Sequence, residues 1–184
     1  MFEKFKDCPA IIFDDRGYSH GTTWLTAPRL TEKTNVPTAM FKRRDPMSPD
    51  LSNGEISSSQ KGNTFLQPLP QTDKWRYHGK TVMLIDERTI SQAEHTGLFL
   101  EAANGTKFTG SPTQGANGDV TNLSVPGGIY VRFSRHGVWH TDGRQLQRVG
   151  LQPIVEVRST LAGIGPGKDE ILEAAIEYSE RGHR

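Results

Sequence analysis

Residues 80–94 read Lys80-Thr-Val-Met-Leu-Ile-Asp-Glu-Arg-Thr-Ile-Ser-Gln-Ala-Glu94, and they indicate the architecture of the chain more clearly than any other segment. They begin with a near-continuous apolar run, which is typical of a strand buried on both faces of a parallel sheet. A helix is predicted next, from Ser91 to Ala103, because Asn104-Gly105 follows as a C-terminal stop signal. A buried strand that leads directly into a helix predicts an α/β protein.

Comparable patterns occur on both sides of this unit. Strands are predicted at 10–13, 36–41, 107–109, 120–125, 129–133 and 152–157, and further helices at 22–30 and 169–178. Strands that alternate with helices favour a layered α/β architecture. The 184 residues suit a single domain, in which a Pro-, Ser- and Gly-rich stretch at about 44–73 is expected to be a long irregular insertion.

Composition excludes several classes of protein. Basic and acidic residues nearly balance, at 22 against 21, so no nucleic-acid partner is expected. No stretch approaches the roughly 18 apolar residues of a membrane span. Cys8 is the single cysteine, and His136 and His140 lie in a predicted hairpin, so neither a metal site nor a cofactor is expected. Gly163–Lys168 is similar to a phosphate-binding loop, but Asp169 stands where a hydroxyl should bind magnesium.

Ser91 permits two interpretations. With Glu94 it forms a capping box by sequence, in which each side chain hydrogen-bonds to the backbone of the other residue. A serine at a helix N-terminus after a buried strand also suits a nucleophile, because the free amides there can stabilise an oxyanion. The amide of Gln92 is the first candidate donor. His95, one turn along the same helix, is expected to be exposed or to pack against its neighbours.

Six motifs in order along the chain resemble those of the tail-specific, carboxy-terminal processing serine peptidases. They are Ile11-Ile-Phe-Asp-Asp-Arg-Gly-Tyr18, Val82 to Glu94 with its Ser-x-Ala-Glu, Gly110-Ser-Pro-Thr-Gln-Gly115, Leu123-Ser-Val-Pro-Gly-Gly128, Asp142-Gly143 followed by Val149-Gly-Leu-Gln-Pro153, and Gly167-Lys-Asp-Glu-Ile-Leu-Glu-Ala174. The resemblance covers nearly the whole chain. It implies a Clp-protease/crotonase-like fold of β-β-α layers and cleavage of peptide bonds through an acyl-enzyme on Ser91.

Departures from the family pattern bear on the general base. Ala116 occupies the position of the lysine in the Ser/Lys branch, so the chain is closer to the tricorn-core and retinoid-binding-protein-like branch, where a histidine is the base. That histidine lies upstream of the first strand, so we expect that N-terminal parts of a parent protein are missing or that another histidine serves. His20 is the candidate within the chain, and Gln147 falls at the position of the orienting glutamate. Gly21 is the candidate second oxyanion donor.

The sequence thus predicts a serine hydrolase that acts on peptide or protein substrates. Two alternatives stay open: an esterase acting on activated or short-chain esters, and a non-catalytic domain that binds peptides or apolar ligands. Homo-oligomerisation is also left open. Relatives are commonly exported, but the charged N-terminus from Met1 shows no export signal, so the compartment is not assigned.

Overall fold

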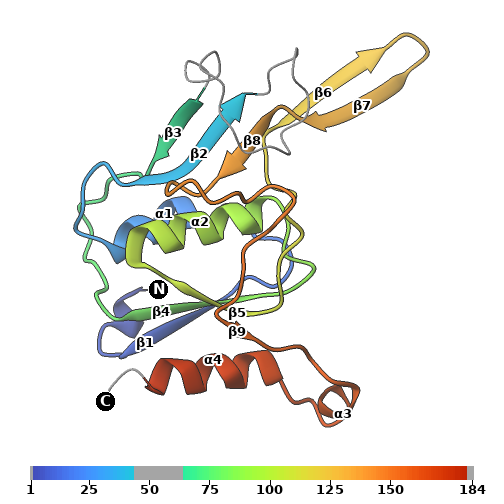
Figure 1. Cartoon of the computed structure of the whole chain (residues 1–184). Coiled ribbons are helices and arrows are strands. Elements are labelled where there is room, and N and C mark those ends of the chain that lie inside the picture. The colour runs from blue at the N-terminus through green and yellow to red at the C-terminus, as the bar shows by residue number, and fades with distance from the viewer. Residues whose placement is uncertain (1, 44–63, 182–184) are drawn as a thin grey trace.

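The computed structural model describes residues 2–43 and 64–181 (Figure 1). Its central layer is a four-stranded parallel sheet with the order β1-β4-β5-β9. These strands are β1 (Ala10–Asp14), β4 (Lys80–Ile85), β5 (Lys107–Gly110) and β9 (Val155–Glu156). Helix α2 (Gln92–Asn104) lies on one face of this sheet and helix α4 (Glu170–Glu180) on the other.

Strand β4 is buried on both faces, as its apolar run predicts. Met83 and Ile85 belong to the larger core cluster on the α2 side, together with Leu98 and Phe99 of that helix. Val82 and Leu84 belong to a smaller cluster with Ile171 and Ala175 of α4. Because successive side chains of a strand point to opposite faces, one short segment anchors both helical layers.

A second, antiparallel sheet covers the outer side of α2 (Figure 1). Its order is β3-β2-β8, with β2 at Pro37–Arg43, β3 at Thr64–Pro68 and β8 at His136–Trp139. Helix α2 is therefore enclosed between two sheets, and every residue from Ala93 to Leu100 is buried. A helix that is buried all round needs no polar face, which explains why α2 has little amphipathic character.

Smaller elements complete the described chain. They are the 3₁₀ turns η1 (Phe2–Phe5) and η2 (Ala27–Leu30), the short helices α1 (Thr23–Thr26) and α3 (Leu161–Ile164), and the hairpin of β6 (Val120–Val125) and β7 (Ile129–Ser134). The hairpin projects away from the layered body (Figure 1). No helix of the described residues is long and apolar enough to cross a membrane.

Three predicted segments need correction, and one element was not predicted. The helix predicted at 22–30 divides into α1 and η2, since Pro28 lacks the amide that would continue an α-helix. The stretch expected to be irregular contains β3, which forms because β2 supplies a partner strand; residues 44–63 lie outside the described residues. The strand predicted at 152–157 is only two residues long, at β9, and α3 was not predicted.

Candidate active site

Ser91 lies at the turn that joins β4 to α2, in a strained backbone conformation. Its φ is 54° and its ψ is −109°, a region that residues with a side chain seldom adopt. Such a conformation costs roughly 1–3 kcal/mol and persists only where the surroundings impose it. A serine on a strained strand-to-helix turn is also the arrangement that exposes the hydroxyl of the nucleophile elbow in α/β-hydrolases.

Thr89 fixes the turn that precedes Ser91. Its side chain is fully buried, and its hydroxyl accepts a hydrogen bond from the amide of Asp86 at 3.1 Å. The same hydroxyl donates to the carbonyl of Asp15 at 3.2 Å, and the carbonyl of Thr89 accepts from the amide of Gln114 at 3.2 Å. The turn is therefore attached both to the loop after β1 and to the loop after β5.

Glu94 holds Ser91 itself. Its carboxylate is fully buried, and Oε2 accepts from the amides of Ser91 at 3.1 Å and Ala116 at 3.0 Å. The other oxygen, Oε1, accepts from the hydroxyl of Thr113 and the amide of Gly115, each at 2.6 Å. Four donors satisfy the buried charge, and the carboxylate joins the nucleophile turn to the loop that follows β5.

The capping-box interpretation of Ser91 and the nucleophile interpretation are compatible. Both contacts of the box are present, since the Ser91 amide donates to Glu94 at 3.1 Å and the Ser91 side chain faces the Glu94 amide, but the second contact does not reach the geometry of a full hydrogen bond. The next amide, of Gln92, is the first of the helix and has no acceptor within it. A hydroxyl and a free amide thus lie side by side at the N-terminus of α2.

Ser91 lines a cavity of about 170 Å³. The other lining residues come from four segments of the chain: Trp24, Phe41, Gln92, His95, Asn117, Gly118 and Asp119. Aromatic rings form much of its wall, since the ring of Trp24 lies 6.1 Å and that of Phe41 lies 5.9 Å from the ring of His95. The cavity therefore combines a hydroxyl with an apolar wall, which suits a substrate that carries an apolar side chain next to a carbonyl.

His95 belongs to the wall of this cavity and is not suited to be a base. Of the two possibilities left by the sequence, exposure or packing, the structure shows packing, because His95 is buried. Burial lowers its pKa to about 4. The side-chain amide of Asn117 donates to Nδ1 at 3.2 Å, so Nε2 carries the proton and donates to Oε1 of Gln67 at 2.7 Å. With both ring nitrogens engaged, the neutral imidazole has no free position to accept a proton from Ser91.

His20 and Gly21 lie on the loop between β1 and α1, and neither lines the Ser91 cavity. The loop does reach α2, through a 3.0 Å hydrogen bond between the hydroxyls of Ser19 and Thr96. His20 is exposed to solvent. Gly21 has a φ of 77°, and a side chain there would be strained, so its glycine is required by the turn.

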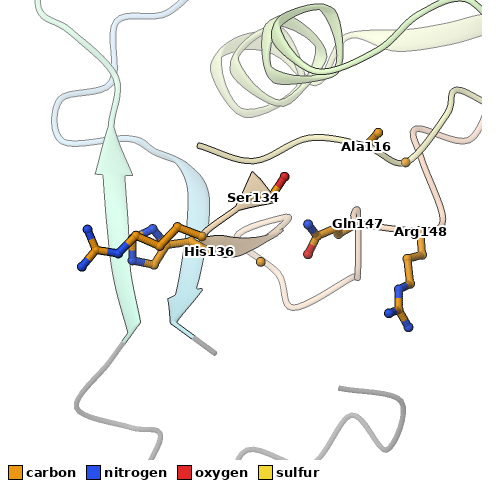
Figure 2. Close-up of a pocket in the computed structure, with 8 residues that line it drawn as sticks. Ala116, Ser134, His136, Gln147 and Arg148 are labelled. Carbon is orange, nitrogen blue, oxygen red and sulfur yellow. The ribbon is translucent and has the colours of Figure 1, made fainter. Parts of the chain in front are cut away.

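Gln147 and Ala116 lie together in a second cavity, of about 290 Å³ (Figure 2). The remaining lining residues are Gly115, Ser134, Arg135, His136, Gly137 and Arg148. The structure therefore brings the positions of the family's lysine and orienting glutamate into one place, but not into the Ser91 cavity. The two cavities are neighbours because the loop 115–119 contributes residues to both.

Sequence analysis missed a histidine–carboxylate pair between the two cavities. Nδ1 of His136 lies 2.8 Å from Oδ1 of Asp119, and the same oxygen accepts from the amide of His136 at 3.1 Å. The two residues are 17 positions apart and meet because the β6–β7 hairpin returns the chain to its starting point. Asp119 lines the Ser91 cavity and His136 lines the second one.

A charged clamp anchors the loop that carries His20 and Gly21. Arg16 donates through Nε and Nη2 to the carboxylate of Asp14, and through Nη1 and Nη2 to that of Asp169, with both contacts to Asp169 at 2.8 Å. The guanidinium lowers the pKa of Asp169, which is also the N-cap of α4. Next to the clamp, burial raises the pKa of Asp15 to about 7, and its Oδ2 has no hydrogen-bond partner among the described residues.

Solved structures share this fold. A candidate peptidase from Parabacteroides merdae is 23% identical, with 97% of this chain and 54% of that chain covered and a TM-score of 0.74. Mature CPAF is 16% identical, with 97% and 44% covered and a TM-score of 0.63. The photosystem II D1 C-terminal processing protease is 14% identical, with 82% and 35% covered and a TM-score of 0.56. The chain thus spans about half or less of the length of these proteins.

These likenesses confirm the α/β fold expected from the sequence, and a layered crotonase-like core is consistent with them. The comparison with curated proteins gave no match. The family model described as peptidase family S41 matches residues 2–157, which is most of the chain and includes Ser91, Glu94 and both cavities. On this evidence, the chain belongs to peptidase family S41.

Proposed function

We propose that the chain is the catalytic unit of a serine hydrolase that cleaves peptide bonds through an acyl-enzyme on Ser91. The observation that carries the proposal is the strained Ser91 at the N-terminus of α2, held by the buried Glu94 and opening onto an apolar cavity. A simple N-cap would need neither the strain nor the cavity. Membership in a peptidase family supplies the reaction class.

In the proposed reaction, Ser91 Oγ attacks the carbonyl carbon of the scissile peptide while a base takes the hydroxyl proton. The charge that develops on the carbonyl oxygen is stabilised by the amide of Gln92. Gly21 in the first loop is the candidate second donor from the sequence, but it does not line the Ser91 cavity, so this role requires the first loop to approach Ser91. Collapse of the tetrahedral intermediate breaks the carbon–nitrogen bond, and the leaving amine takes the proton from the base. Water then hydrolyses the acyl-enzyme by the same steps and regenerates Ser91.

Two histidines are candidates for a base within the chain. His20 is the candidate within the chain that the sequence offers, and Gln147 stands at the position of the orienting glutamate, but neither lines the Ser91 cavity. His136 is favoured by its hydrogen bond to Asp119, because a carboxylate on Nδ1 orients an imidazole. His136 itself lines the second cavity, and its partner Asp119 lines the Ser91 cavity. A pH–rate profile separates them: substitution of the true base removes the acidic limb, and substitution of the other leaves it in place.

Fluorophosphonate labelling tests the proposal directly. A fluorescent fluorophosphonate should modify the wild-type protein at Ser91, as peptide mass spectrometry would show, and Ser91→Ala should abolish the labelling. Ser134→Ala is the matched control, because Ser134 is an exposed serine that lines the neighbouring cavity, and this variant should label like the wild type. A folded protein that is not labelled, or is labelled equally in Ser91→Ala, would instead support a non-catalytic binding domain.

A further inference from the structure

The β6–β7 hairpin, called the arm below, is solvated along its whole length. Its two strands pair with each other and with no other strand in the part of the chain that the structure describes. All six residues of β7 are exposed, and β6 has four exposed and two half-buried residues. Figure 1 shows the arm extending beyond the second sheet, away from both helical layers.

The register of the arm separates its side chains into two unlike faces. Residues directly opposite each other in an antiparallel pair point to the same side. One side holds the pairs Leu123–Val131 and Val125–Ile129, followed by Thr121–Phe133. This set is called the apolar face.

The other side of the arm is mainly polar. It carries the pairs Asn122–Arg132, Ser124–Tyr130 and Val120–Ser134. A 3.0 Å hydrogen bond from Arg132 Nε to Asn122 Oδ1 shows that opposite residues do share a side. The alternation therefore places four of the five branched aliphatic side chains, together with Phe133, on the apolar face, while Val120 and Tyr130 lie on the other side.

The large side chains of the apolar face are about half exposed to solvent. Ile129 is 59% exposed, Leu123 51%, Phe133 48% and Val131 43%. Two-stranded hairpins are marginally stable in water unless a hydrophobic face is covered. A contiguous apolar patch on a small domain is typical of a binding surface, whereas single exposed apolar residues need no explanation.

The size of the apolar face indicates which kind of occupant fits. Six residues of strand span about 20 Å, and the two strands lie about 5 Å apart. A stable dimer needs about 800 Å² on each partner, and one face of two short strands offers much less. The face matches a single extended polypeptide segment of about six residues, whose alternate side chains would lie against it.

The root of the arm is continuous with the candidate active site. Gly118 and Asp119, directly before β6, line the Ser91 cavity. Ser134 and His136, at the end of β7 and beyond it, line the second cavity. The hydrogen bonds from His136 to the Asp119 carboxylate and from the Arg135 amide to the Asp119 carbonyl, the latter at 3.0 Å, join the two ends of the arm. The two ends of the arm therefore lie at the two cavities.

We propose that the apolar face of the arm binds an extended segment of the polypeptide substrate, with apolar side chains at alternate positions, and leads it to Ser91. This inference rests on the proposed peptidase function and adds a binding surface for the substrate chain that lies outside the Ser91 cavity. The contact is weak and reversible, as a substrate contact must be if product is to leave.

Binding of an unfolded chain tests the proposal. Fluorescein-labelled β-casein is titrated with the Ser91→Ala protein, which cannot cleave it, and the fluorescence anisotropy gives Kd. Leu123→Ser with Val131→Ser should raise Kd at least about tenfold, because both residues lose their apolar contact. Asn122→Ser with Ser124→Ala is the matched control on the opposite face and should change Kd less than about twofold. Circular dichroism confirms that all variants are folded.

Two results would overturn the proposal. One is a casein Kd that does not respond to the apolar-face substitutions. The other is a wild-type dimer in analytical ultracentrifugation that dissociates in the same variants, which would assign the face to a second copy of the chain. Fluorophosphonate labelling of Ser91 does not require binding to the arm, so these substitutions should leave the labelling unchanged. Failure of labelling would therefore refute the proposed function. Failure of the casein result, with labelling intact, would refute only the proposed role of the arm.

Discussion

Glu94→Gln is the substitution that tests most directly what holds Ser91 in its strained conformation. In the wild type, each carboxylate oxygen accepts two hydrogen bonds, Oε1 from Thr113 and Gly115 and Oε2 from Ser91 and Ala116. A glutamine amide has the same shape but must present an NH₂ group on one side. With NH₂ in the Oε2 position, two backbone amides would face a donor.

The less costly orientation of the substituted side chain places its NH₂ group at the position of Oε1. The hydroxyl of Thr113 can then turn to accept, but the amide of Gly115 is left buried without an acceptor. A buried amide without an acceptor lowers the free energy of unfolding by about 1–3 kcal/mol. The remaining hydrogen bonds are also weaker, because the acceptor is no longer charged. We expect Glu94→Gln to lower the free energy of unfolding by about 3 kcal/mol and to slow the labelling of Ser91.

Urea denaturation followed by tryptophan fluorescence measures the stability, and the second-order rate of fluorophosphonate labelling reports on Ser91. Glu87→Gln is the matched control, because Glu87 is exposed and accepts a single hydrogen bond, from Ser111 at 3.0 Å. It should change the stability by no more than about 0.5 kcal/mol. If Glu94→Gln were as stable as this control and labelled at the wild-type rate, the carboxylate would not be what holds the nucleophile turn.

Three further predictions concern titration and the first loop. Burial raises the pKa of Asp15 to about 7, so its ionisation should cost stability as the pH rises from about 4 to 8. The loss amounts to about 2 kcal/mol of unfolding free energy after discounting for solvent screening, and Asp15→Asn should remove it. Urea midpoints measured across that pH range check this. Burial lowers the pKa of His95 to about 4, so stability should be complete above pH 6.5 and fall as the pH drops through 4, by about 3 kcal/mol at most. His95→Gln should lack this fall, and an imidazole that titrates near 6.5 by NMR would contradict the prediction. Arg16→Ala should cost about 2 kcal/mol, because Asp14 and Asp169 lose a shared partner, and should speed hydrogen exchange of residues 15–22; unchanged exchange would show that the clamp does not hold the loop.

The segments that the sequence predicts well are those whose signals are local. The apolar run of β4 is long enough to exclude an exposed strand, and Gly105 ends α2 in the left-handed conformation that favours glycine. Where a strand depends on a distant partner, local signals fail. The clearest case is β3, because the pattern at Thr64–Pro68 is short and followed by Leu69-Pro70, and β2 supplies the hydrogen bonds that make it a strand.

In the candidate site, too, some features follow from local sequence and others depend on distant segments. Ser91 could be selected because its position after a buried strand and before a helix is visible in the sequence. Its contact with Glu94 could also be anticipated, since a capping box spans only four residues. The remaining bonds of Glu94, to residues 19 to 22 positions away, depend on where the loop after β5 lies.

The sequence by itself determined the α/β layering, the family motifs and the nucleophile candidate, because strand and helix periodicity and helix-end signals act within a few residues. Only the tertiary structure decided that His95 is a buried, neutral wall residue, that Gln147 lies in a second cavity, and that Asp119 meets His136. Those facts depend on which distant segments pack together. Arg16 and Asp169 show the limit most clearly, since their 2.8 Å contact joins residues 153 positions apart that no local pattern relates.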